Sequence, residues 1–322
     1  MKITDPLQEI DGILTRTDMR ASVRAGSALW TFPPEPVETD QSAAPWWLWW
    51  NLLSLDAPAV AIVWAALFAR ASGAKLQASE AIALVLSVWV IYTSDRLLDG
   101  WTARNRAGLQ FRHLFCDRHR FVLGASVVAA SGLVLWLMTA NSLAVEEMAG
   151  IKLGVIVVLY MAAIHAGRSR LGWVLSKEIS VGLLFTLGVT LPLWSRSVRF
   201  PWHEFLPWTF FGLLCSLNCL SIEFWENHRE SSGWKQRPHP LVRWAAPHID
   251  ALAAALAVAA LAACFLQQAA GTSQPALLAI CAAALLLLFL NLLRSKLSAA
   301  ALRVLADLAL FAPALAALVI RG

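Results

Sequence analysis

The sequence predicts an all-α fold, a multi-pass transmembrane bundle of about nine helices. Hydrophobic residues make up 58% of the 322-residue chain, whereas soluble globular proteins contain roughly 45–50%. Charged residues account for only 15%, against about 25% in soluble proteins, and the mean hydropathy is +0.61. A soluble fold of this size cannot bury so much apolar surface, so we expect a lipid bilayer to surround the chain.

The apolar residues fall into separate stretches, each close to the ~20 residues that a helix needs to cross the hydrocarbon core. The predicted spans are residues 46–70, 79–99, 120–140, 147–166, 176–194, 205–227, 249–270, 275–293 and 300–320. Residues 1–44 are mixed polar and contain no apolar core of a signal peptide, so we expect a cytosolic tail, partly disordered or interfacial. The predicted transmembrane domain then covers residues 45–322.

The distribution of positive charge predicts the orientation. With nine spans, 20 of the 26 lysines and arginines fall on the side of the N-terminal tail. Because positively charged loops stay in the cytosol, we expect a cytosolic N-terminus in the cell or inner membrane. The sequence has no Lys/Arg-rich run with interleaved aromatic residues, so a nucleic-acid partner is not expected. The five cysteines form no CxxC motif and lie mostly in apolar stretches, which argues against a disulfide framework or a zinc site.

Polar side chains inside the predicted spans lie near their cytosolic ends. The set comprises Asn51, Asp56, Asp95, Asp99, Lys177, Glu178, Asn218, Glu223, Glu226, Asn227 and Asp307. Ionisable residues within a membrane are costly and by default mark a functional site. Their common depth predicts one chamber, lined by carboxylates and open toward the cytosol.

Two carboxylate clusters carry most of this signal. Asp95 and Asp99 are four residues apart on one helix face, where two like charges are best tolerated if a cation lies between them. Magnesium suits such oxygen ligands, and proteins usually hold it through one or two carboxylates plus substrate phosphates. A solvated helix end is the alternative for one cluster alone, whereas two clusters at one depth predict a Mg²⁺ clamp for a diphosphate.

The second cluster allows two registers. Asn218 and Glu226 form one pair of oxygen donors, and Glu223 and Asn227 form the other. Both registers stay open, so the predicted metal ligands are the carboxylates of both clusters: Asp95, Asp99, Glu223 and Glu226. Asn218 and Asn227 are predicted to bind the substrate.

Over roughly residues 46–320 the chain resembles the UbiA superfamily of intramembrane prenyltransferases. Those proteins have nine transmembrane helices and two Asp-rich motifs at the cytosolic ends of the second and sixth helices. The first motif, NxxxDxxxD, reads Ile91-xxx-Asp95-xxx-Asp99 here, and the second reads Asn218-xxx-Ile222-xxx-Glu226. Both aspartates of the first motif match, its asparagine does not, and the second motif has no aspartate.

The resemblance implies a Mg²⁺-dependent enzyme that transfers a prenyl group from an isoprenyl diphosphate to an aromatic or lipid-like acceptor through an allylic cation. Lys177, where the family often has a basic residue, is the leading candidate to bind the diphosphate. Further candidates for substrate binding are Arg96, Arg168 and Arg170. The aromatic rings of Tyr92 and Trp225 lie near the clusters in the sequence, where they either stabilise the cation or pack between membrane helices.

Other interpretations of these residues remain. Asn51 and Asp56 either orient an acceptor and act as a general base or form a hydrogen bond between helices. Asp307 has a simple partner in Arg303, one turn earlier. Cyclisation of the prenyl diphosphate without an acceptor is the alternative within the enzyme class, and the altered second motif keeps it open. A non-catalytic membrane scaffold or a transporter is the alternative of another class.

Overall fold

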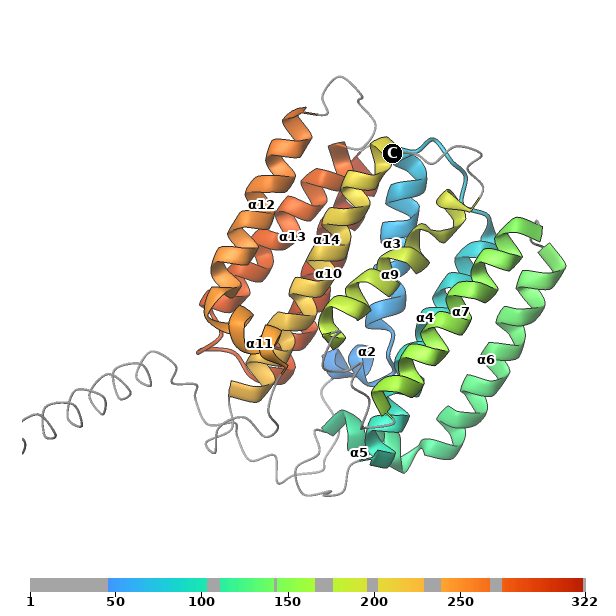
Figure 1. Cartoon of the computed structure of the whole chain (residues 1–322). Helices are drawn as coiled ribbons and strands as arrows, with labels where there is room; N and C mark the ends of the chain where they lie inside the picture. The colour runs from blue at the N-terminus through green and yellow to red at the C-terminus, as the bar shows by residue number, and fades with distance from the viewer. Residues whose placement is uncertain are drawn as a thin grey trace, which may run out of the picture.

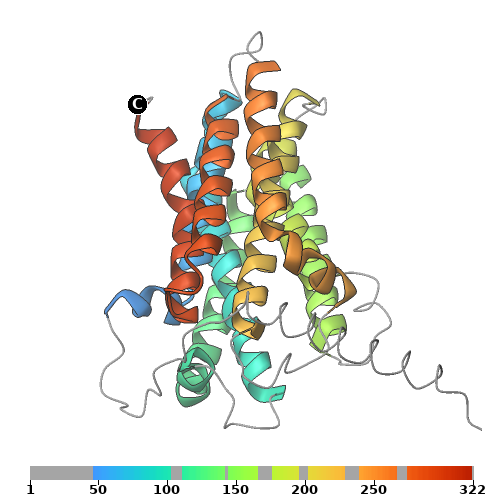
Figure 2. The same cartoon turned by 90° about the vertical axis from the view of Figure 1, so that its left-hand side faces the viewer.

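The computed structural model describes residues 46–102, 111–141, 144–165, 176–195, 202–228, 239–266 and 274–320. Within these ranges the chain is helical and contains no strand. The long helices run side by side as one bundle (Figure 1), and the view in Figure 2 shows that they share a common direction.

Each span predicted from the sequence overlaps one of the long helices. The first half of the chain contributes η1 (Trp46–Leu48), α2 (Trp49–Leu52), α3 (Asp56–Ala71), α4 (Ala78–Thr102), α5 (Phe111–Arg118), α6 (Arg120–Asn141) and α7 (Ala144–His165). The second half contributes α9 (Lys177–Trp194), α10 (Trp202–His228), α11 (Pro240–Ala245), η3 (Ala246–His248), α12 (Ile249–Leu266), α13 (Gln274–Leu292) and α14 (Ala299–Ile320).

Seven segments of the described chain are long and apolar enough to cross a membrane. They lie in α4, α6, α9, α10, the stretch from α11 through α12, α13 and α14. The helix α3 has 16 residues, and the apolar part of α7, Met148–Ile164, is also shorter than a full span. These helices fit an integral, multi-pass membrane protein with lipid around it.

The first predicted span, residues 46–70, is not a single helix. The chain turns at Ser54, whose φ of 56° lies in the left-handed region, and α3 begins only at Asp56. Proline causes this break: Pro58 has no N–H to donate to the carbonyl of Ser54, and its ring would clash with that carbonyl in a continuous helix. In the first turn of α3, where no such bond is needed, Pro58 is tolerated.

The helix α3 forms the centre of the bundle. Its Trp64 and Phe68 are almost completely buried, and both rings pack against Phe211 of α10, with centroids 4.5 and 5.4 Å away. The indole Nε1–H of Trp64 donates to the carbonyl of Leu310 in α14 at 3.0 Å. These contacts join α3 to α10 and α14, the helices that carry part of the charged cluster described below.

Glycine allows α9 to lie close against α10. A Cβ atom at Gly182 would lie 2.2 Å from the Ser216 hydroxyl oxygen and 2.7 Å from the Gly212 carbonyl oxygen. Any side chain there would push the two helices apart. Because Gly182 has no side chain, α9 packs closely against α10, and Lys177 at the start of α9 lies beside the second carboxylate cluster.

Gly182→Ala is expected to destabilise the bundle by about 1–3 kcal/mol, because the added methyl group overpacks the α9–α10 contact. A thermal unfolding scan of the detergent-solubilised protein measures the effect. Gly132→Ala on α6 is the matched control, since a Cβ there meets no atom within 4 Å. Equal melting temperatures for the two variants would contradict the close contact.

The short helices gather at one end of the bundle. Figure 1 shows α2, α5 and α11 at the end opposite the C-terminus of α14. The rings of Trp49 in α2 and Phe115 in α5 meet edge to face at 5.8 Å, and Trp49 and Trp50 remain about half exposed. Short helices with exposed indoles are typical of the interfacial region of a membrane.

Candidate functional site

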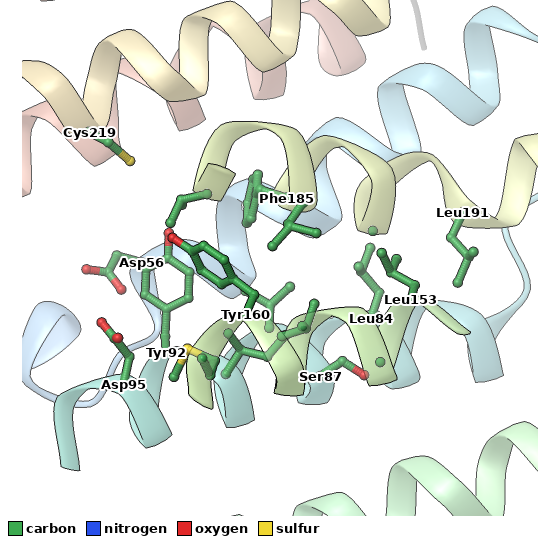
Figure 3. Close-up of a pocket in the computed structure, with 18 of the residues that line it drawn as sticks. Asp56, Leu84, Ser87, Tyr92, Asp95, Leu153, Tyr160, Phe185, Leu191 and Cys219 are labelled. Atoms are coloured by element: carbon green, nitrogen blue, oxygen red, sulfur yellow. The ribbon is translucent and has the colours of Figure 1, made fainter. Parts of the chain in front are cut away.

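A cavity of about 450 Å³ runs between α4, α7, α9 and α10, with α3, α6 and α14 contributing at its ends. Its two ends differ in chemistry (Figure 3). Asp56, Tyr92, Asp95 and Cys219 lie toward one end, Leu84, Leu153 and Leu191 lie toward the other, and Tyr160 and Phe185 lie between them. The charged end is the end of the bundle at which α4 meets α5 and α10 meets α11.

Most of the site residues predicted from the sequence line this cavity. They are Asp56, Tyr92, Asp95, Arg96, Asp99, Lys177, Asn218, Glu223 and Glu226. They come from α3, α4, α9 and α10, which are far apart in the sequence. Both carboxylate clusters therefore face a single chamber.

The other predicted site residues do not line the cavity or cannot be placed in it. Asn51 is buried behind Asp56 rather than in the cavity wall. Trp225 lies in the core, where its Nε1–H donates to Asn291 Oδ1 of α13 at 2.7 Å. Trp225 thus does not face the cavity, because its helix position points it toward α13. Arg168, Arg170 and the side chain of Asn227 lie outside the described residues.

Trp225→Phe is expected to lower stability by about 1–3 kcal/mol, because it leaves the buried Asn291 oxygen without a donor. Binding of the prenyl diphosphate that the resemblance implies should change by less than about twofold. Thermal unfolding and equilibrium binding of the same preparation measure the two effects. Trp136→Phe, on the exposed face of α6, is the control for loss of an indole. Weakened binding with unchanged stability would show that Trp225 contacts the substrate.

A cation from another helix pairs with each carboxylate cluster. Lys177 Nζ, at the start of α9, lies 3.3 Å from Asp95 Oδ2 on α4. A guanidinium nitrogen of Arg303, on α14, lies 3.3 Å from Glu226 Oε1 on α10. Arg303 thus reaches across to the neighbouring helix, and the simple pairing with Asp307 expected from their spacing is not what the structure has.

A buried polar network lies beneath the first cluster. The Asn51 amide donates to Asp56 Oδ2 at 2.6 Å, and a guanidinium nitrogen of Arg96 lies 3.5 Å from the same oxygen. Arg96 also donates to the backbone carbonyl of Asn51. All three residues are less than a tenth exposed. Asn51 therefore positions Asp56, and it links α2 to the start of α3 and to α4.

Two residues that line the cavity, Asp307 and Tyr160, had no role in binding or catalysis predicted from the sequence. Asp307 lines the cavity and accepts a hydrogen bond from the Asn218 amide at 3.2 Å. Tyr160, on α7, donates to the backbone carbonyl of Lys177 at 3.3 Å. One signal was available for Tyr160: the sequence has only two tyrosines, Tyr92 and Tyr160, and both line the cavity.

Acidic side chains outnumber basic ones at the charged end. Among the described residues, seven carboxylates and three cations line it: Asp56, Asp95, Asp99, Glu178, Glu223, Glu226 and Asp307, with Arg96, Lys177 and Arg303. Within the described ranges, no three His, Cys, Asp or Glu side chains converge as a ready-made metal cage. A magnesium ion does not need such a cage, because one or two carboxylates hold it and substrate phosphates complete its coordination. The oxygen donors at this end therefore fit magnesium.

The arrangement can thus bind a metal-complexed anion at one end and an apolar chain along the rest of the cavity. The charged groups lie on α3, α4, α9, α10 and α14, so their positions depend on the packing of the whole bundle. Comparisons of this chain with protein-family models, with curated proteins and with solved structures gave no match.

Proposed function

We propose that this protein is an intramembrane prenyltransferase, which moves a prenyl group from an isoprenyl diphosphate to an acceptor in a Mg²⁺-dependent reaction. The observation that carries the proposal is the division of one cavity into a charged end and a long apolar part. An isoprenyl diphosphate has the same division, with a multiply charged head and a hydrocarbon tail. The resemblance of the two carboxylate clusters to UbiA-type motifs supports the same assignment.

The charge of the cavity supports the metal requirement. A diphosphate is repelled by the carboxylates at this end, which outnumber the cations, unless further positive charge enters with it. Asp95 and Asp99 on α4 and Glu223 and Glu226 on α10 are the residues that would hold Mg²⁺. When bound, Mg²⁺ neutralises the diphosphate and makes it a better leaving group. Lys177 and Arg303 lie beside these carboxylates and bind the remaining phosphate oxygens.

The residues next to the charged end suit an allylic cation. Tyr92, Tyr160 and Phe185 line the cavity where the head region meets the apolar part. Their ring faces attract a cation, and the apolar walls exclude water that would otherwise capture it. The charged end thus binds the diphosphate leaving group, and the aromatic and apolar walls protect the allylic carbon from water.

An acceptor has a polar contact available in the same region. Asn218 lines the cavity, its amide nitrogen donates to Asp307, and its buried Oδ1 has no hydrogen-bond partner among the described residues. A buried carbonyl oxygen that receives no hydrogen bond costs about 1–3 kcal/mol. A hydroxyl or N–H group on the molecule that receives the prenyl group would donate to this oxygen and remove the cost. This favours transfer over cyclisation. The aromatic walls at Tyr92, Tyr160 and Phe185 would also serve a terpene cyclase, which is the second candidate.

We further infer that α3 and α7 complete a bundle of nine crossings, as in the UbiA superfamily. The charged end of the cavity then faces the cytosol, on the same side as the N-terminal tail. The excess of lysine and arginine on that side supports this orientation. A cysteine-accessibility experiment on intact cells, with single cysteines introduced into the loop after α4 and the loop after α3, tests it.

Diphosphate release by the purified protein tests the proposed function. Prenyl diphosphates of ten to twenty carbons are supplied with and without Mg²⁺, first alone and then with a panel of phenolic and lipid-like acceptors. Release that requires both Mg²⁺ and an acceptor is the result expected for a transferase. Mg²⁺-dependent release without acceptor, together with a hydrocarbon or terpene alcohol, would make the protein a cyclase. No release and no binding of any prenyl diphosphate would overturn both.

A further inference from the structure

The cavity extends along almost the full length of two of the helices that line it, α4 and α9. On α4 its lining residues run from Ser79 to Asp99, and on α9 and the residue after it they run from Lys177 to Ser195. At 1.5 Å per residue, these stretches correspond to about 30 Å and about 27 Å along the helix axes. The cavity therefore spans a distance comparable to the hydrocarbon thickness of a membrane.

The far part of this cavity is lined mainly by apolar side chains. Aliphatic side chains line it from several helices: Leu84, Val88, Leu153, Val157, Leu184 and Leu191. Two glycines, Gly154 on α7 and Gly188 on α9, also line it, and a Cβ atom at either would meet nothing within 4 Å. The absence of side chains at these positions keeps the passage open well beyond the charged end.

The far end is also lined by small and polar groups. Gly150 lies under Met138 of α6, so closely that a Cβ atom there would overlap the Met138 methyl group. Ser79, Glu80 and Ser195 line the cavity at the same end. These polar groups mark where the apolar part of the cavity ends, about 27 Å along α9 from Lys177.

Together with the proposed function, on which this inference rests, these observations identify the substrate class. We propose that the protein binds long-chain prenyl diphosphates, with about twenty carbons or more. An amino-acid residue contributes three backbone bonds and spans about 3.5 Å when extended, so an isoprene unit with four bonds spans about 4.5–5 Å. Four units from Lys177 reach about 19 Å, past Gly188, which lies about 16 Å along α9 from Lys177.

A shorter chain fills this cavity poorly. A ten-carbon tail ends about 10 Å from the head by the same measure, before the level of Gly188. The cavity beyond it would then stay empty, and the lining side chains would lose their contacts. Because the tail of any prenyl diphosphate is already in an apolar solvent when it lies in the bilayer, such packing contacts decide the selectivity between chain lengths.

Equilibrium binding of non-hydrolysable thiolodiphosphates with ten, fifteen and twenty carbons tests the proposal. The full chain in lipid nanodiscs is titrated in the presence of Mg²⁺, at equal mole fractions of each analogue in the lipid. The twenty-carbon analogue is expected to bind at least about tenfold more tightly than the ten-carbon one. Gly188→Phe should remove this advantage and leave the ten-carbon analogue within about twofold of its original affinity.

Matched variants make the result specific. Gly132→Phe on α6 introduces the same ring at a glycine with open space that does not line the cavity, and it should alter none of the affinities. Gly154→Phe blocks the same passage from α7 and repeats the test if Gly188→Phe does not fold. The proposal is overturned if ten- and twenty-carbon analogues bind equally to the original protein, or if both blocking variants weaken all chain lengths alike.

The same titration separates this inference from the proposed function. If prenyl alcohols of equal length bind as well as the thiolodiphosphates, or if Mg²⁺ has no effect on binding, the cavity is not a diphosphate site and the proposed function fails. If Mg²⁺-dependent binding is intact but independent of chain length, the proposed function stands and only the long-chain assignment fails.

Discussion

Asp95→Asn combined with Asp99→Asn is expected to lower Mg²⁺-dependent diphosphate release by at least about a hundredfold. The two carboxylates share one face of α4, line the charged end of the cavity, and supply half of the proposed metal ligands. Removing preorganised charge from such a site commonly costs two to three orders of magnitude in rate. The Mg²⁺ concentration that gives half-maximal release should also rise by about tenfold or more, because amide oxygens bind the ion less tightly.

Steady-state diphosphate release at several Mg²⁺ concentrations measures both effects. Asparagine preserves the size of each side chain, so the fold should persist, and gel filtration with a thermal scan confirms this. Asp117→Asn is the control: its carboxylate belongs to α5 at the same end of the bundle, pairs with Arg120 at 3.7 Å and does not line the cavity. Unchanged release by the double variant would exclude the first cluster as a metal site.

Arg96→Met is expected to destabilise the protein by about 3–5 kcal/mol. Arg96 and Asp56 form a buried ion pair, with side chains 10% and 4% exposed. Removing the guanidinium leaves the Asp56 carboxylate with neutral donors only, the Asn51 amide and the backbone N–H of Ala57. An uncompensated buried charge costs several kcal/mol, far more than the methylene packing that methionine retains.

Restoring charge balance should recover most of this loss. In the double variant Arg96→Met/Asp56→Asn both charges are absent and the amide keeps a hydrogen-bonding partner in Asn51, so we expect stability within about 1–2 kcal/mol of the original protein. Thermal unfolding of the four proteins in one detergent forms a double-mutant cycle. If the two single losses simply add in the double variant, Arg96 stabilises the bundle through packing, and the ion-pair interpretation is wrong.

The local patterns in the sequence determined where the helices lie. Long apolar stretches and their flanking polar residues fixed the range of each long helix to within a few residues, because a lipid-exposed backbone must form its hydrogen bonds internally. The four-residue spacing of Asp95 and Asp99 placed both on one face. The first span is the exception, because Pro58 interrupts it and the chain turns at Ser54.

The partners of the polar side chains were decided by tertiary packing. Arg303 and Asp307 are neighbours on α14, yet Arg303 pairs with Glu226 and Asp307 accepts from Asn218, both on α10. The spacing alone favoured a pair within the helix. Only the position of α14 against α10 brings the competing partners within reach.

The sequence by itself therefore determined a membrane-spanning, all-helical chain and the end of each helix at which its polar residues lie. The three-dimensional structure decided which faces meet. Trp225 shows the difference: it stands beside the second cluster in the sequence but points to Asn291 of α13, whereas Tyr160, far from either cluster in the sequence, lines the cavity. The physical reason is that a transmembrane helix is apolar on every side, so its hydrophobic pattern does not indicate which face its neighbours cover.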